Sequence, residues 1–154
     1  MRAFTLLLLT LPAWSPMCHA AEILLNERSP AASIVSSEGL GTARASLTAK
    51  VTQASAHGYC RFDPYRETTA NGGLLTFEQC LSKAVADHPG QLSAVADCPG
   101  KLLRDTYGRR LKLFGRGEFG NNWIDLSNNE PIGHCVQCNN DAADSQFEAL
   151  CPFD

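Results

Sequence analysis

The chain has 154 residues, of which 44% are hydrophobic and 19% are charged, so it is long enough for one domain with a buried core. It carries 13 basic and 16 acidic side chains, a formal net charge of −3. This mildly acidic balance excludes the strongly basic surface that nucleic acids and anionic lipids attract, and we expect neither as a partner.

The first twenty residues, "MRAFTLLLLTLPAWSPMCHA", have the pattern of a signal peptide. Arg2 precedes a short apolar run, and the small residues Cys18 and Ala20 stand at the −3 and −1 positions of a cleavage site. We expect cleavage after Ala20, and an uncut N-terminal anchor is the alternative. The mature protein is then expected in the periplasm or outside the cell, with no stable membrane insertion.

Residues 21–44 are rich in Ala, Ser and Glu with weak periodicity, which predicts a flexible leader. We expect a single disulfide-stapled α+β domain over 45–154. Its first element is a half-buried strand at 45–53, where apolar and polar residues alternate. The stretch that follows, 57–73, is expected to form an extended loop because it contains Asp-Pro and Asn-Gly turn signals.

The strongest helix signal begins at Thr76. This residue is a good N-cap, and Gln79 follows at the spacing of a capping box. An apolar stripe with helical period continues through Phe77, Cys80, Leu81, Ala84 and Val85. The sequence His88-Pro89-Gly90 ends the helix.

Short strands separated by turns are predicted after this helix. They cover 91–98, 100–105, 109–115, 123–126, 130–135 and 145–151, with a Gly-rich loop at 115–122. In the last strand Phe147, Ala149 and Cys151 are expected to point inward. The predicted fold class is therefore α+β, a small antiparallel sheet with one main helix.

Six cysteines follow the expected signal peptide, and an even number in an exported chain indicates disulfides. Sequence alone leaves several pairings open, and the pairing we expect is Cys60–Cys80, Cys98–Cys151 and Cys135–Cys138. Cys135 and Cys138 form a Cys-x-x-Cys next to His134, so a zinc site and a redox pair are the alternatives. A second ligand pair and a following helix are both missing from the pattern, so we expect a structural staple, with no metal and no cofactor.

The known catalytic signatures for serine hydrolases, zinc peptidases and nucleotide-binding loops are absent from the sequence. His57, His88 and His134 are candidate general bases without a recognisable partner. Asp125 and Glu130 are a candidate acid/base pair across the 123–132 hairpin. Because these signals are weak, an enzyme is the less favoured interpretation.

Binding character is concentrated in 114–131, which combines aromatic residues, arginine and adaptable Asn and Gly. A second aromatic and arginine-rich loop, 59–66, is expected to join it in one surface. The predicted binding residues are Tyr65, Arg116, Phe119, Asn121, Asn122 and Trp123. For Trp123 the alternative is a place in the core.

The function that we expect from the sequence is an exported protein-binding module, such as an inhibitor or immunity-type protein that acts on an envelope enzyme. The size, the staples and the loop composition favour this interpretation. A small hydrolase of an envelope polymer, with His134 or His57 and nearby carboxylates in catalysis, is the alternative. A purely structural envelope component is a third class.

Overall fold

The structure is a computed structural model, and it describes residues 21–26, 29–62, 72–117, 120–132 and 141–152. The expected signal peptide lies outside the described residues, as do Cys135, Cys138 and His134.

One antiparallel sheet dominates the described part of the chain, and its strands follow one another in sequence order from β1 to β8. The strands are β1 (Glu22–Ile23), β2 (Ala32–Glu38), β3 (Ala45–Lys50), β4 (Leu92–Asp97), β5 (Leu102–Arg104), β6 (Arg110–Gly117), β7 (Gly120–Asp125) and β8 (Glu130–Ile132). The helices are α1 (Gln53–Phe62), α2 (Phe77–Asp87) and α3 (Asp141–Leu150). The α+β class and the antiparallel sheet are confirmed. The small sheet and the single main helix are corrected, because the described residues form eight strands and three helices.

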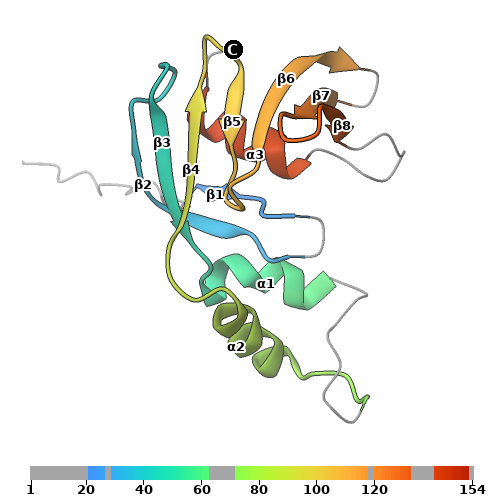
Figure 1. Cartoon of the computed structure of the whole chain (residues 1–154). Helices are drawn as coiled ribbons and strands as arrows, with labels where there is room; N and C mark the ends of the chain where they lie inside the picture. The colour runs from blue at the N-terminus through green and yellow to red at the C-terminus, as the bar shows by residue number, and fades with distance from the viewer. Residues whose placement is uncertain (1–20, 27–28, 63–71, 118–119, 133–140, 153–154) are drawn as a thin grey trace, which may run out of the picture.

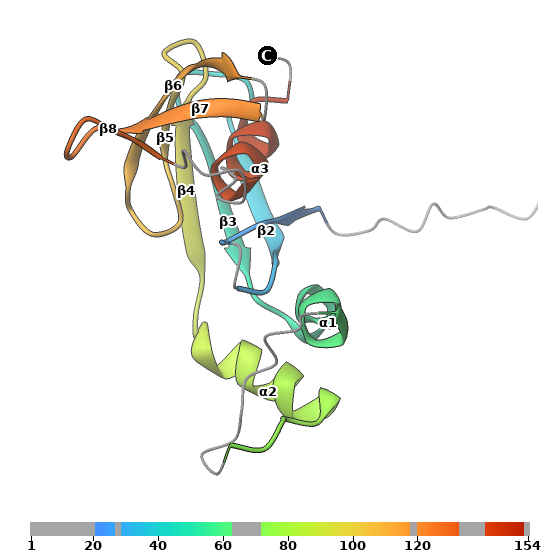
Figure 2. The ribbon, with the colours of Figure 1, turned by 90° about the vertical axis from the view of Figure 1, so that its right-hand side faces the viewer.

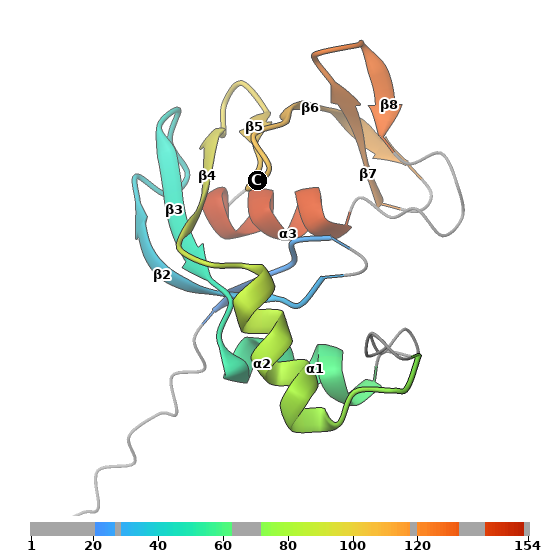
Figure 3. The same cartoon turned by 60° about the horizontal axis from the view of Figure 1, so that its bottom comes forward.

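The sheet curls around α3, which lies against one face, while α1 and α2 form a separate pair at the far end (Figures 1 and 2). The core lies between α3 and the concave face of the sheet. Trp123 on β7 is completely buried there, and its ring meets Phe147 of α3 edge to face at a centroid distance of 5.3 Å. Figure 3 shows α3 crossing the strands, so this one helix covers the core-facing side of several strands.

Helix α2 confirms the strongest sequence signal. The Thr76 backbone N–H donates to Oε1 of Gln79 at 2.9 Å, and the Gln79 N–H donates to Oγ1 of Thr76 at 3.3 Å. These reciprocal bonds satisfy two backbone donors at the helix start. The buried face carries Cys80, Leu81 and Ala84, as the apolar stripe predicts.

Helix α1 replaces the first part of the loop expected over 57–73, so this prediction is wrong for residues 57–62. Thr52 and Ser55 begin the helix, because the Ser55 N–H donates to Oγ1 of Thr52 at 3.1 Å and the Thr52 N–H donates to Oγ of Ser55 at 3.0 Å. The disulfide Cys60–Cys80 then joins α1 to α2. Gly58 lowers the intrinsic helix propensity, and packing against α2 overcomes it.

Helix α3 replaces the strand expected at 145–151. It begins at Asp141, so the expectation that no helix follows Cys138 is also wrong. Its buried residues are Ala143, Gln146, Phe147 and Leu150. Their spacing of three and four residues is a helical period, whereas the expected strand was based on alternation. The polar Gln146 hid this period, because glutamine does not look like a core residue.

The flexible leader expected over 21–44 is also replaced, because β1 and β2 occupy much of it. Ile23 and Leu25 are buried in the core. Gln146 of α3 donates from Nε2 to the carbonyl oxygen of Leu24 at 2.9 Å and accepts the Thr106 N–H at 3.0 Å. This buried amide holds the first strand in place, which the composition of 21–44 does not reveal.

Two of the three expected disulfides are present, Cys60–Cys80 and Cys98–Cys151. Both indicate an oxidising compartment. The expected Gly-rich loop at 115–122 is largely wrong, because Gly115 pairs with Asn122 and Arg116 pairs with Asn121 in the β6–β7 ladder.

Candidate functional site

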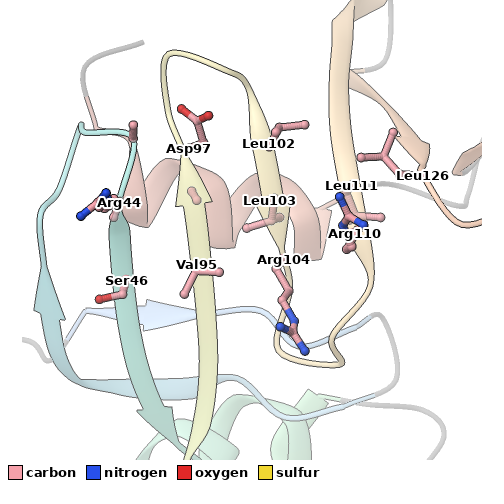
Figure 4. Close-up of a pocket in the computed structure, with 13 residues that line it drawn as sticks. Arg44, Ser46, Val95, Asp97, Leu102, Leu103, Arg104, Arg110, Leu111 and Leu126 are labelled. Carbon is pink, nitrogen blue, oxygen red and sulfur yellow. The ribbon is translucent and has the colours of Figure 1, made fainter.

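A groove of about 460 Å³ lies on the face of the sheet opposite to α3, across strands β3 to β6 (Figure 4). We call it the outer groove. Its lining is apolar in the centre and basic at the edges. The residues that matter for its chemistry are Arg44, Val95, Asp97, Leu102, Arg104, Arg110 and Leu126.

The strand register explains why these side chains meet. Ser46 pairs with Val95, Val95 pairs with Arg104, and Arg104 pairs with Arg110, so one row crosses four strands. Partners in a ladder project from the same face of a sheet. The neighbouring residues of this row, such as Leu103, point to the core instead.

Arg104 and Arg110 stand directly opposite each other in this row. Residues in such positions have Cβ atoms about 5 Å apart, and like charges there repel. Both side chains are exposed, and neither forms a salt bridge within the described part of the chain. From these paired positions the two side chains extend in different directions (Figure 4), and each guanidinium group can bind a carboxylate or another oxyanion through two parallel hydrogen bonds.

The centre of the outer groove is apolar. Val95 is 44% exposed and Leu126 is 39% exposed, which is high for aliphatic side chains. Leu126 lies beside the arginine pair because its N–H donates to the carbonyl oxygen of Arg110 at 2.8 Å. The groove therefore offers a patch for an apolar group directly next to the two cations.

One carboxylate belongs to the groove, but it is already engaged. Oδ1 of Asp97 accepts the Gly100 N–H at 2.9 Å. A Cβ atom at Gly100 would collide with this carboxylate, so only glycine permits the close approach. Asp97 is thus held in the β4–β5 turn, away from the arginine pair on the next strands.

The arginines belong to a basic segment within an acidic chain. Between 101 and 116 the basic residues are Lys101, Arg104, Arg109, Arg110, Lys112 and Arg116, and the single acidic residue is Asp105. Asp105 is buried and binds Nε of Arg109 at 2.7 Å. The net charge of the whole chain conceals this local excess, of which Arg104 and Arg110 belong to the outer groove.

The predicted binding residues are only partly brought together. Arg116 is exposed, and Asn121 and Asn122 are half-buried near it on β6 and β7. Trp123 is fully buried, so its assignment to a binding surface is wrong and the core alternative is correct. Tyr65 and Phe119 lie outside the described residues.

Sequence reasoning missed the outer groove because its arginines are scattered among three segments. The signal that was available is the alternation in β5 and β6. It places Arg104 and Arg110 on the face opposite to Leu103 and Leu111. Only the pairing of the two strands makes the arginines neighbours.

The candidate catalytic residues that the structure describes do not converge, and His134 lies outside the described residues. His57 packs edge to face on Phe77 at 5.1 Å, and Nδ1 of His88 lies 3.0 Å from the carbonyl oxygen of Ala84 at the end of α2. Both helices lie far from the β7–β8 hairpin, which carries Asp125 and Glu130 (Figure 1).

Asp125 and Glu130 are register partners across this hairpin, but each is occupied by turn contacts. Oδ1 of Asp125 accepts the Ser127 N–H at 2.8 Å, and Oε2 of Glu130 accepts from Nδ2 of Asn128 at 3.0 Å. The hydrogen bonds from Ser127, first from its backbone and then from its side chain, lower the pKa of Asp125 below its ordinary value. A carboxyl group that is ionised in this way is not a proton donor near neutral pH.

Among the described residues no group of three or more His, Cys, Asp or Glu side chains is placed to bind a metal ion. None of the helices in the described ranges is long and apolar enough to cross a membrane. No protein-family model, curated protein or solved structure matches this chain.

Proposed function

We propose that the chain is an exported protein-binding module, an inhibitor or immunity-type protein, whose outer groove binds an acidic and partly apolar surface of another protein. The observation that carries this proposal is the pairing of Arg104 with Arg110, two exposed cations at neighbouring strand positions, neither of which forms a salt bridge with a described residue. Carboxylates of the partner that bind these two arginines relieve their mutual repulsion.

The chemistry of the groove supports a protein as the partner. Arginine is enriched at binding hot spots, and interfaces combine an apolar centre with a polar rim. Val95 and Leu126 form such a centre beside the arginine pair. A nucleic acid is a poorer fit, because the chain as a whole is acidic and its negative charge opposes the approach of a polyanion.

The disulfides support the exported location, since they form and persist in oxidising compartments. The hydrolase alternative gains no support from the described residues, because His57, His88 and the Asp125–Glu130 pair lie on separate parts of the fold.

The test is a comparison of three proteins in cross-linking capture from envelope extract, followed by titration with the purified partner. The variant R104Q/R110Q removes the arginine pair. The control K50Q/K83Q removes the same number of positive charges elsewhere, from an exposed lysine on β3 and from a lysine on α2 that is paired with Asp87. We expect a partner that binds wild type and control, weakens with rising salt, and binds the arginine variant at least about tenfold less tightly. Equal binding of that partner to all three proteins, or no specific partner at all, would contradict the proposal.

A further inference from the structure

A second cavity, of about 240 Å³, lies between the β6–β7 hairpin and α3. We call it the inner pocket. It lies beside the disulfide Cys98–Cys151, since Cys151 contributes to its lining. The other lining residues are Lys101, Leu113, Gly115, Arg116, Asn121, Phe147 and Glu148.

A β-bulge directs Arg116 toward this pocket. Leu113 pairs with Trp123, but Gly115 pairs with Asn122, so the register shifts by one residue between them. Without the bulge, simple alternation from Leu113 would place Arg116 on the outer face with Lys112. With it, Arg116 pairs with Asn121 and shares the side of the sheet that faces α3.

Asn121 confirms the direction of this row. Its Nδ2 donates to Oδ1 of Asp144 on α3 at 3.0 Å, so the side chain points to the helix. Bulges that redirect a side chain are frequent next to functional sites.

Lys101 reaches the same pocket from a strained backbone. Its φ angle is 53°, a left-handed conformation that is unfavourable for residues other than glycine. The position is fixed on both sides, because the Lys101 N–H donates to the carbonyl oxygen of Cys98 at 3.1 Å and its own carbonyl accepts the Leu113 N–H at 2.9 Å. Residues other than glycine in such strained conformations are frequent at functional sites.

The charges in the inner pocket are not neutralised by one another. Lys101, Arg116 and Glu148 are exposed, and none forms a salt bridge with a described residue. Leu113 and Phe147 supply an apolar wall between the hairpin and the helix. The lining of the pocket thus includes two cations, two apolar side chains that form a wall, and one carboxylate.

We propose that the inner pocket binds a small organic carboxylate with an apolar body. The carboxylate lies between Lys101 and Arg116, and the apolar body lies against Leu113 and Phe147. This site is separate from the outer groove, on the other face of the sheet, so the proposal does not depend on the protein partner.

The experiment uses the isotope-labelled mature protein and a defined set of probes, followed by NMR of the backbone amides. The probes are 3-phenylpropionate, hexanoate and benzoate, and the uncharged control is 3-phenylpropanol. We expect saturable shifts at Lys101, Gly115, Arg116 and Glu148 with at least one carboxylate, and much weaker binding of the alcohol. Absence of such shifts at millimolar concentration of all three carboxylates, or equal binding of the alcohol, would overturn the proposal.

Variants separate a binding role from a structural one. R116Q should weaken the best carboxylate about tenfold or more, because a charge-assisted hydrogen bond is lost. K112Q, on the same strand but the other face, is the matched control and should leave binding unchanged. K101G should raise the melting temperature by relieving strain and yet weaken binding. Undiminished binding in both R116Q and K101G would contradict the proposed site.

Discussion

Nε1 of Trp123 donates a hydrogen bond of 2.7 Å to Oδ1 of Asp144, and this bond joins the centre of β7 to α3. The indole ring is fully buried, so the N–H has no access to water. The same carboxylate oxygen accepts Nδ2 of Asn121. One side chain of α3 therefore satisfies two donors from the strand that it covers.

Replacing Asp144 with alanine should destabilise the fold, because the buried indole N–H of Trp123 loses its acceptor. We expect a loss of about 1–3 kcal/mol in the free energy of unfolding. D144N keeps an acceptor oxygen, so its loss of unfolding free energy should be distinctly smaller than that of the alanine variant. Thermal and chemical unfolding of the two variants checks this, and an alanine variant as stable as wild type would show that the bond contributes nothing.

Removing the disulfide Cys60–Cys80 should loosen α1 and α2 selectively. These helices form a pair at the far end of the molecule, apart from α3 and most of the sheet (Figure 2). In C60A/C80A we expect faster amide hydrogen exchange in residues 53–62 and 77–87, with protection of β3 to β6 largely kept.

Removing Cys98–Cys151 provides the contrast, because this bridge joins β4 to the end of α3 across the core. It spans 53 residues in sequence, against 20 for the other bridge. On the chain-entropy model, loss of Cys98–Cys151 lowers the free energy of unfolding by about 4 kcal/mol, and loss of Cys60–Cys80 lowers it by about 3 kcal/mol. C98A/C151A should therefore lower protection throughout the sheet. Equal exchange patterns in the two double variants would contradict the separation of the helix pair.

The capping box of α2 gives a prediction with a close control. T76A removes the side-chain acceptor of the Gln79 N–H, and we expect a loss of about 1 kcal/mol in unfolding free energy. S82A replaces another hydroxyl residue on the same helix, but in its exposed middle, where alanine is the better helix former. Denaturant titration should thus show a lower midpoint for T76A and an unchanged or higher one for S82A.

Asp125 should make the free energy of unfolding depend on pH in the acidic range. Its pKa in the folded protein is below the ordinary value of 3.8, chiefly because Ser127 donates hydrogen bonds to it. The folded state then favours the ionised form, so this stability is complete above about pH 4 and is lost as the pH falls through the lowered pKa. D125N should flatten that part of the stability profile.

The control for this prediction is E130Q on the opposite strand, which keeps Asp125 and its contacts with Ser127. The stability of E130Q should still fall with pH in the acidic range where the stability of D125N no longer does. A direct NMR titration of the Asp125 carboxyl group in wild type gives the second check, and a midpoint at or above 3.8 would contradict the lowered pKa.

Local signals in the sequence were sufficient for some elements. The capping box at Thr76 and Gln79 and the apolar stripe behind it predicted α2, because every one of these interactions lies within a few residues of the next. The alternation in 45–53 predicted β3 with its buried residues Leu47 and Ala49 for the same reason.

Other elements depend on contacts that are distant in sequence. Helix α3 was missed because a buried Gln146 takes a core position, and its partners are Leu24 and Thr106 from the opposite part of the chain. Strand β1 was missed as well, because α3 stabilises it through the hydrogen bond from Gln146 to the carbonyl oxygen of Leu24. Local propensity does not contain this information.

The sequence by itself determined the antiparallel α+β class and helix α2, since these follow from local periodicity. It left several cysteine pairings open, and the structure decided for Cys60–Cys80 and Cys98–Cys151. The tertiary structure alone decided where the charges gather. Strand pairing places Arg104 against Arg110, and a single-residue shift in the β6–β7 register turns Arg116 toward α3. A side chain changes faces with every residue of register, so the two candidate sites exist only once the strands have paired.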